Sequence, residues 1–142
     1  MEHSDRVRSN TSAEKNQKIE QEILNSIRYF AHNRKEIPAR IAELDAEWDI
    51  ERALELNAAV LALAGTVLAA VHNKKWLLLP ALVTVFLTQH ATQGWCPPLP
   101  LLRSLGIRTR QEIDSEKVAL KVLMGDFKSS HNSHELWEAA SH

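Results

Sequence analysis

The chain has 142 residues, of which 44% are hydrophobic and 25% are charged, with a formal net charge of −1. This length suffices for one modest domain, and the near-neutral charge excludes a polybasic nucleic-acid binder. A single cysteine excludes a disulfide framework within one chain. The charges are unevenly spread, because Lys74 and Lys75 are the only charged residues between Leu56 and Leu102. The average composition therefore hides an apolar middle third between polar flanks.

The residues before this apolar part predict a polar tail followed by helices. We expect residues 1–14, which are polar, to form a disordered tail. Over residues 15–53 the apolar side chains recur at helical spacing and predict two amphipathic helices. They are Ile19, Ile23, Ile27 and Phe30 in the first helix, then Ile37, Ile41, Leu44 and Trp48 in the second. The second helix has Pro38 in its first turn and is expected to run directly into the apolar part. Its apolar seam can form a coiled coil, pack on the first helix or lie on a bilayer surface.

Residues 54–107 predict a transmembrane helical hairpin. Two apolar runs, 56–72 and 76–93, are joined by a short polar turn. A helix of 18 residues spans about 27 Å, close to the hydrocarbon core of a bilayer. Apolar residues lie on all sides of each run, as is typical of a buried or lipid-facing helix. The alternative is a soluble bundle with two apolar core helices, which a chain of this length cannot easily cover. The predicted fold class is therefore an all-α membrane protein, a two-helix transmembrane hairpin with amphipathic cytoplasmic helices before and after it.

Small residues predict how the hairpin helices pack. One set lies in the first run and one in the second: Ala58, Ala62, Gly65 and Ala69, then Ala81, Thr84 and Thr88. The spacing places each set on one helix face, and in lipid small side chains allow helices to approach closely. The two faces can meet each other or a second subunit. We therefore expect self-association.

Basic residues near the hairpin predict its orientation. Five arginines flank the two runs and two lysines lie in the turn: Arg40, Arg52, Arg103, Arg108 and Arg110, against Lys74 and Lys75. Basic residues concentrate on the cytoplasmic side of membrane proteins. Both termini are therefore expected in the cytoplasm. The expected partners are the lipid bilayer and an unknown protein that binds the cytoplasmic helices.

The string Gly94-Trp95-Cys96-Pro97 follows the second run and continues with further prolines. Three prolines in four positions are expected to end the helix and hold the chain extended. Cys96 is the weak candidate for chemistry, because Arg52 and Arg103 would lie on its side of the membrane and lower its pKa. Its thiolate would then accept a persulfide or be oxidised. The alternative is a small, inert residue packed at the helix end.

The segment from about Asp49 to Ile107 resembles the YgaP-like transmembrane domain family, small inner-membrane helical hairpins of undefined function. The residues that carry the resemblance are Glu51-Arg52, Gly65, Gly94-Trp95-Cys96-Pro97, Leu101-Leu102 and Leu105-Gly106-Ile107. In some members the hairpin anchors a rhodanese (sulfurtransferase) domain and looks like a dimerisation unit, so the resemblance implies a homodimeric hairpin in a bacterial inner (plasma) membrane. Many members have a second cysteine after the Leu-Gly pair, where this chain has Ile107-Arg108-Thr109-Arg110. A dithiol role is therefore not implied.

Residues 108–127 predict a further cytoplasmic helix, since Thr109 and Glu112 have the spacing of a capping box. Its apolar face would carry Ile113, Leu120 and Leu123, and it would end near Gly125. Residues 128–142 are expected to be a polar tail.

Histidines indicate no metal or cofactor site. His72 and His90 lie near opposite ends of the hairpin, about 20 Å apart by helix rise, and cannot share a metal within one subunit. We expect His90 to hydrogen-bond a neighbouring helix or to lie beside Cys96 at the inner interface. Because no catalytic constellation is recognised, the predicted function is a non-catalytic membrane anchor or adaptor. The alternative is a thiol-based sulfur or redox component that uses Cys96.

Overall fold

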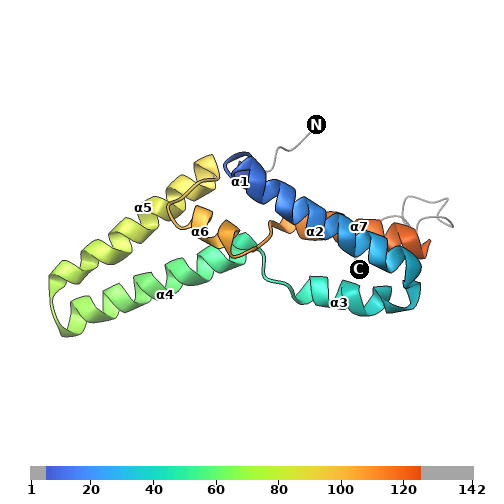
Figure 1. Ribbon diagram of the computed structural model, residues 1–142. Coiled ribbons are helices and arrows are strands. Elements are labelled where there is room, and N and C mark those ends of the chain that lie inside the picture. Colours follow the sequence, from blue (N-terminus) through green and yellow to red (C-terminus); the bar gives the residue numbers. More distant parts are fainter. Residues whose placement is uncertain (1–5, 126–142) are drawn as a thin grey trace, which may run out of the picture. The chain divides into compact units, whose positions relative to one another are not determined.

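The structure is a computed structural model that describes residues 6–125, and its secondary structure consists of helices (Figure 1). The chain divides into two compact units, which we describe separately. Unit 1 contains the described residues up to Asn16 together with Trp48–Thr109, and unit 2 contains Gln17–Glu47 together with the described residues from Arg110. The all-helical expectation is confirmed for this part of the chain. The predicted polar tail, 128–142, lies outside the described residues.

Unit 1 is built on a helical hairpin. Its elements are α1 (Arg6–Ser9), the first residues of α2 (Ala13–His32), α4 (Ile50–Val71), the 3₁₀ turn η2 (Lys74–Leu77), α5 (Leu78–Gln93) and α6 (Leu99–Ser104). Figure 1 shows α4 and α5 running antiparallel, side by side, from the turn at η2. The Asn73 side chain accepts a hydrogen bond of 2.9 Å from the Lys75 backbone N–H and so caps this turn.

The first hairpin helix begins at a cap that interrupts the preceding helix. Asp49 is the N-cap of α4, and its carboxylate accepts a bond of 2.8 Å from the Arg52 backbone N–H. The Ile50 N–H donates to the Arg108 carbonyl at 3.0 Å, which satisfies another free amide at this helix end. The expected continuous helix from Ile37 is therefore wrong: α3 ends at Ala46, and Glu47 is extended. A side chain that binds its own backbone competes with helix continuation at this point.

Gly65 is the point of closest approach between α4 and α5. A Cβ atom built on Gly65 would lie 2.5 Å from Pro80 Cδ and 3.1 Å from Leu79 Cβ. Any larger side chain at this position would have to separate the two helices. The residues that Gly65 meets are Leu79 and Pro80 rather than the small residues of α5.

The end of α5 differs from the expected extended segment. Gly94 adopts a left-handed conformation, with φ 72°, and its N–H donates to the His90 carbonyl at 2.7 Å. The helix α6 then begins directly after Pro98, whose φ of −70° and ψ of −19° are already helical. Pro100 lies in the first turn of α6, where the missing N–H of proline costs nothing. Gly94 therefore ends α5, and the prolines start α6.

The buried core of unit 1 lies at the open end of the hairpin, away from its turn. It contains Val7, Ile50, Ala53, Leu54, Cys96, Leu99 and Leu102, with Trp95 and Ile107 packed against it. The prediction of a disordered tail over residues 1–14 is wrong for residues 6–9, because α1 is helical and Val7 is buried in the core. A single apolar side chain in a polar segment is too little for a periodicity argument to detect.

Unit 2 is a small packing of helices around its own core. It contains the remainder of α2, the 3₁₀ turn η1 (Arg34–Glu36), α3 (Ile37–Ala46) and α7 (Arg110–Met124). Its buried residues are Ile37, Leu44, Ile113 and Leu120, joined by Phe30, Ile41 and Leu123. The apolar residues predicted for these helices therefore pack on one another. Of the three alternatives for the apolar seam of the second predicted helix, packing on other helices of the chain is the one observed.

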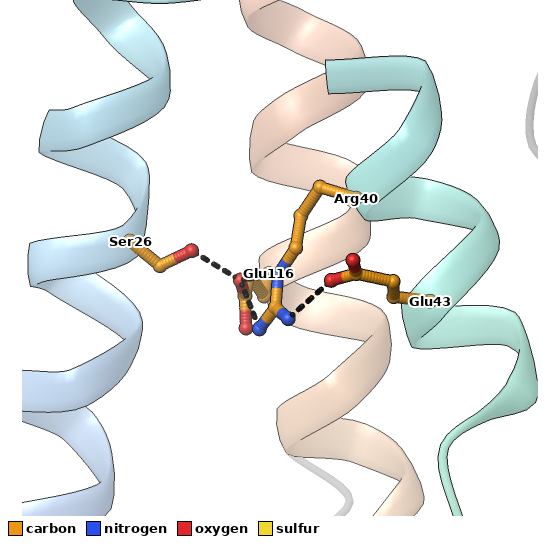
Figure 2. A network of polar contacts seen from close by, with 4 residues as sticks. All are labelled: Ser26, Arg40, Glu43 and Glu116. Carbon is orange, nitrogen blue, oxygen red and sulfur yellow. Dashed lines mark hydrogen bonds and ion pairs between the residues drawn. The ribbon is translucent and has the colours of Figure 1, made fainter. Parts of the chain in front are cut away.

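A buried ion pair joins three helices of unit 2 (Figure 2). Glu116 of α7 is fully buried, and its carboxylate accepts bonds from Ser26 of α2 at 2.5 Å and from Arg40 of α3 at 3.1 Å. Arg40 also reaches the exposed carboxylate of Glu43 at 3.1 Å. Charged residues thus stabilise contacts between helices inside this unit, and none of them was singled out for such a role from the sequence.

Candidate functional site

Large apolar side chains are exposed along most of the hairpin. They include Leu56, Val60, Leu63, Val67, Val71, Leu78, Leu82 and Val85. Contiguous exposed apolar surface on this scale marks an interaction site rather than a soluble helix surface. The hairpin helices therefore bury little of their apolar surface against the described residues.

Among the described residues, one helical stretch, within Arg34–Val71, is long and apolar enough to cross a membrane. Its apolar window is 11% buried, which is low for the core helix of a soluble protein. By contrast, α5 has 16 residues, because the chain leaves the turn as a 3₁₀ helix before α5 begins. That is shorter than the roughly 20 residues that a membrane-spanning helix needs. One candidate spanning helix is found where the sequence predicted two, and the second span stays a proposal.

The hydroxyl groups on the hairpin are satisfied within their own helices. Thr66 donates to the Ala62 carbonyl at 2.7 Å, and Thr88 donates to the Thr84 carbonyl at 2.8 Å. Thr84 itself donates to the Ala81 carbonyl at 2.8 Å. These side chains therefore need no water or partner to complete their donor bonds, a requirement for polar groups in an apolar medium.

The two small-residue faces do not meet within the chain. On α4, Ala58, Ala62 and Ala69 are half-buried, and the buried Gly65 contacts α5. On α5, Ala81, Thr84 and Thr88 are all exposed. The α4 face thus packs within the hairpin, through Gly65, whereas the small residues of the α5 face are exposed.

Aromatic and basic residues mark both ends of the apolar surface. At the turn, the Trp76 indole N–H donates to His72 Nδ1 at 3.2 Å, beside the two turn lysines. At the other end, the Arg52 guanidinium lies over the Trp48 ring at 4.9 Å from its centroid. Tryptophan and basic side chains prefer the boundary between a bilayer and water.

The N-terminal segment caps the C-terminus of α5, a contact that the sequence patterns did not reveal. Arg6 donates to the Ala91 and Thr92 carbonyls at 3.0 and 3.3 Å, and Asn10 donates to the Gln93 carbonyl at 3.2 Å. These carbonyls lie in the last turn of α5, where a cation also complements the helix dipole. A Cβ atom on Gly94 would lie 2.4 Å from Arg6 Cβ, so glycine is required for this close contact.

Arg103 is a second residue whose contacts the sequence patterns did not reveal. It is 2% exposed and donates to Thr11 Oγ1 at 3.2 Å, to Asn16 Oδ1 at 2.9 Å and to the Ile107 carbonyl at 3.2 Å. Its guanidinium therefore ties α6 to the N-terminal segment and to the chain that follows. The expected role of Arg103, as a cation that activates Cys96, is replaced by a structural one.

Cys96 is 3% exposed within the core of unit 1. Burial raises the pKa of its thiol, and a backbone hydrogen bond involving Leu99 opposes this rise in part. The predicted lowering of this pKa by nearby arginines is therefore not found, because burial has the largest influence on the thiol. A thiol of this kind is held in its neutral form at neutral pH, which disfavours nucleophilic chemistry.

A small cavity of about 90 Å³ lies between α4 and α5 near their open end. His90 and Cys96 both line it, which confirms that they lie near each other. The remaining lining is almost entirely apolar, and includes Leu61, Val83 and Phe86. His90 Nδ1 is buried without a hydrogen-bond partner among the described residues. Residues 6–125 contain no group of three or more His, Cys, Asp or Glu side chains that could hold a metal ion.

No family model, curated protein or solved structure matches this chain.

Proposed function

We propose that the chain is a membrane-anchored adaptor whose α4–α5 hairpin lies in a bacterial inner (plasma) membrane. Both termini lie in the cytoplasm, and unit 2 presents its helices to a protein partner there. The observation that carries the proposal is the hairpin, in which Lys74 and Lys75 are the only charged residues after Glu55 and large apolar side chains are exposed. Burying that surface in lipid removes the free-energy cost of its contact with water.

Two further features support insertion into a bilayer. The threonine hydroxyls are satisfied within the helices. The excess of arginines near the open end over lysines at the turn favours an external turn. The resemblance to the YgaP-like hairpins agrees with this assignment.

The adaptor role follows from the surface of unit 2. Its helix α7 exposes Val118 and Val122, one turn apart on a face that is otherwise polar. Unit 2 keeps its remaining large apolar residues mostly in its own core. An exposed valine pair on a short, stable helix is a suitable contact for another helix.

Insertion and orientation can be tested together with single cysteines. In a Cys96→Ser background, Lys74→Cys places a thiol at the turn, and Lys18→Cys places one on the exposed surface of α2. A membrane-impermeant maleimide added to intact spheroplasts is expected to label the turn variant alone, and to label the control only after lysis. The protein is also expected to resist extraction from membranes by alkaline carbonate. Extraction without detergent, or the reverse labelling pattern, contradicts the proposal.

We also propose that the exposed face of α5 forms a homodimer contact. Its small residues would let two hairpins approach closely in lipid. The variant Thr84→Leu is expected to lower the dimer fraction measured by single-molecule photobleaching in vesicles. Val85→Leu, at an exposed neighbouring position, is the matched control and should leave it unchanged. If the two variants have the same dimer fraction, the exposed face of α5 is not part of the dimer interface.

Cys96 does not supply a second candidate function. Its burial and raised pKa favour the inert thiol over the thiol-based alternative.

A further inference from the structure

Residues 6–16, which we call the strap, are joined to one another by hydrogen bonds of their own. They contain α1, which has four residues, and the first residues of α2. The Thr11 hydroxyl donates to the Val7 carbonyl at 2.7 Å, and the Asn16 side chain donates to the Arg8 carbonyl at 2.9 Å. These bonds connect α1 to the start of α2, so the strap can move as one piece.

Polar contacts fasten the strap to the end of the hairpin and to α6 (Figure 1). The Arg6 and Asn10 side chains bond to carbonyls in the last turn of α5, and Lys15 Nζ donates to the Pro100 carbonyl of α6 at 3.0 Å. All four of these bonds lie at exposed positions. An exposed hydrogen bond contributes little net stability, because water replaces the partner that is lost.

Val7 attaches the strap to the apolar core of unit 1. Among residues 6–16 it is the buried one, and it belongs to the same buried cluster as Cys96 and Leu99. The strap backbone reaches this place too, since a Cβ atom on Gly94 would lie 3.0 Å from the carbonyl carbon of Arg6. One valine supplies only a small part of the apolar burial that usually holds a helix in place.

Arg103 is buried against the strap by polar rather than apolar contacts. Its guanidinium is 2% exposed and donates to Thr11 Oγ1 and Asn16 Oδ1. A charge that stays buried after losing its partners is costly. When the strap departs, however, water reaches the guanidinium and takes the place of both acceptors. Departure of the strap therefore leaves no buried charge behind.

We propose that the strap opens as a unit while the hairpin and α6 stay folded, and that this opening controls access to the buried end of the hairpin. A helix of four residues is not stable alone in water, so α1 depends on its neighbours. Segments with few buried apolar contacts and exposed hydrogen bonds open at a lower free energy than the core. Opening uncovers Cys96, Leu99 and the Arg103 guanidinium together. All these contacts lie within unit 1, so this proposal does not depend on insertion into a membrane.

Cys96 is the single cysteine of the chain, so its reaction with a water-soluble maleimide reports the opening directly. The full chain in mild detergent is labelled at increasing urea concentrations, and the adduct is followed by mass spectrometry. Local opening exposes little surface, whereas global unfolding exposes much more, and the dependence on urea scales with that surface. We therefore expect the labelling rate to depend only weakly on urea below the unfolding transition.

Two substitutions in the strap should raise the labelling rate. Val7→Ala removes two buried carbon atoms and should raise it about tenfold, whereas Val85→Ala, at an exposed position of α5, should leave it unchanged. Arg6→Gln weakens the bonds to the end of α5 and should raise the rate about twofold. Its control is Lys18→Gln, which removes a positive charge from an exposed position of α2 beyond the strap.

Hydrogen exchange separates opening of the strap from loosening of the whole unit. In Val7→Ala the amides of α1 should exchange faster, in proportion to the labelling of Cys96. The amides around Gly65, in the middle of α4, should keep their wild-type rates.

Three results contradict the proposal. Labelling that follows urea as steeply as global unfolding does overturns it, because the thiol then becomes accessible only in the unfolded chain. Unchanged labelling in Val7→Ala overturns it as well, and so does faster exchange around Gly65 in that variant. A chain that is extracted without detergent contradicts the membrane proposal instead, and the same labelling can then be measured in buffer.

Discussion

The hairpin of unit 1 and the helices of unit 2 place apolar and polar side chains in opposite ways. In the hairpin the large apolar residues are exposed, and the threonine hydroxyls bond to their own helices. In unit 2 the apolar residues form a core, and charged side chains such as Glu116 bond between helices. The same chain therefore pairs its helices by two different kinds of contact. Close backbone approach joins α4 to α5, whereas an apolar core and an ion pair join α3 to α7.

The largest effect is expected from breaking the ion pair of unit 2. Arg40→Met removes the guanidinium of Arg40 from the buried Glu116 carboxylate, and loss of one partner of a buried pair costs about 3 kcal/mol or more. Hydrogen exchange of the full chain should therefore become faster in α3 and α7 but not in α4 and α5.

Glu43 provides the matched control for this variant. It contacts the same arginine, but its side chain is 67% exposed, so Glu43→Gln should cost only a few tenths of a kcal/mol. If both substitutions accelerate hydrogen exchange equally, the buried contact between Arg40 and Glu116 contributes no more to stability than the exposed contact between Arg40 and Glu43.

The next largest effect is expected at the closest approach in the hairpin. Gly65→Leu cannot be accommodated beside Pro80 without separating the helices, and overpacking of this kind typically costs about 2 kcal/mol. Thermal unfolding in mild detergent should report the loss. The adjacent exposed position supplies the control, Ala64→Leu, which should leave the melting temperature unchanged. A Gly65→Leu protein as stable as this control would refute close packing at Gly65.

The cap at the start of α4 gives a smaller effect. Asp49→Ala removes the acceptor for the Arg52 N–H and should destabilise the first turn of α4 by about 1 kcal/mol. Faster hydrogen exchange of the first amides of α4, with little change beyond Leu56, is the expected signature. If the exchange of α4 changes uniformly, Asp49 supports more than the helix end.

The smallest effect is expected where Arg6 meets α5. Arg6→Gln weakens the capping of the Ala91 and Thr92 carbonyls, which is worth about 0.5 kcal/mol at an exposed helix end. Exchange of the last amides of α5 should rise slightly, and more so at low salt than at high salt, because screening already weakens the wild-type contact. Salt-independent exchange would argue against an electrostatic contribution.

The helices were largely predictable because their signals are periodic. The apolar stripe from Ile19 to Phe30 and the charge-free runs on either side of Lys74 all correspond to helices in the structure. The break at Asp49 was missed, since the apolar spacing continues through Trp48 and a cap depends on one side chain. The start of α6 was missed for a similar reason: prolines end helices, but they also fit a first turn.

The contacts that define the site were less predictable because they join residues far apart in the chain. Gly65 was expected in helix packing, but its partners, Leu79 and Pro80, are not small residues. Arg103 was expected to activate Cys96, yet it bonds to polar groups near the N-terminus. No local pattern reports which of several polar residues will meet a buried arginine.

The bonds from the N-terminal segment to the end of the hairpin impose an order of assembly during synthesis. Arg6 and the Ala91 carbonyl are separated by 85 residues, and Arg103 and Thr11 by 92. The N-terminal segment therefore leaves the ribosome long before its partners exist, and contacts of such separation form late. The hairpin must be complete through α6 before residues 6–11 can close its open end. This segment is thus made before the hairpin but reaches its final structure after it.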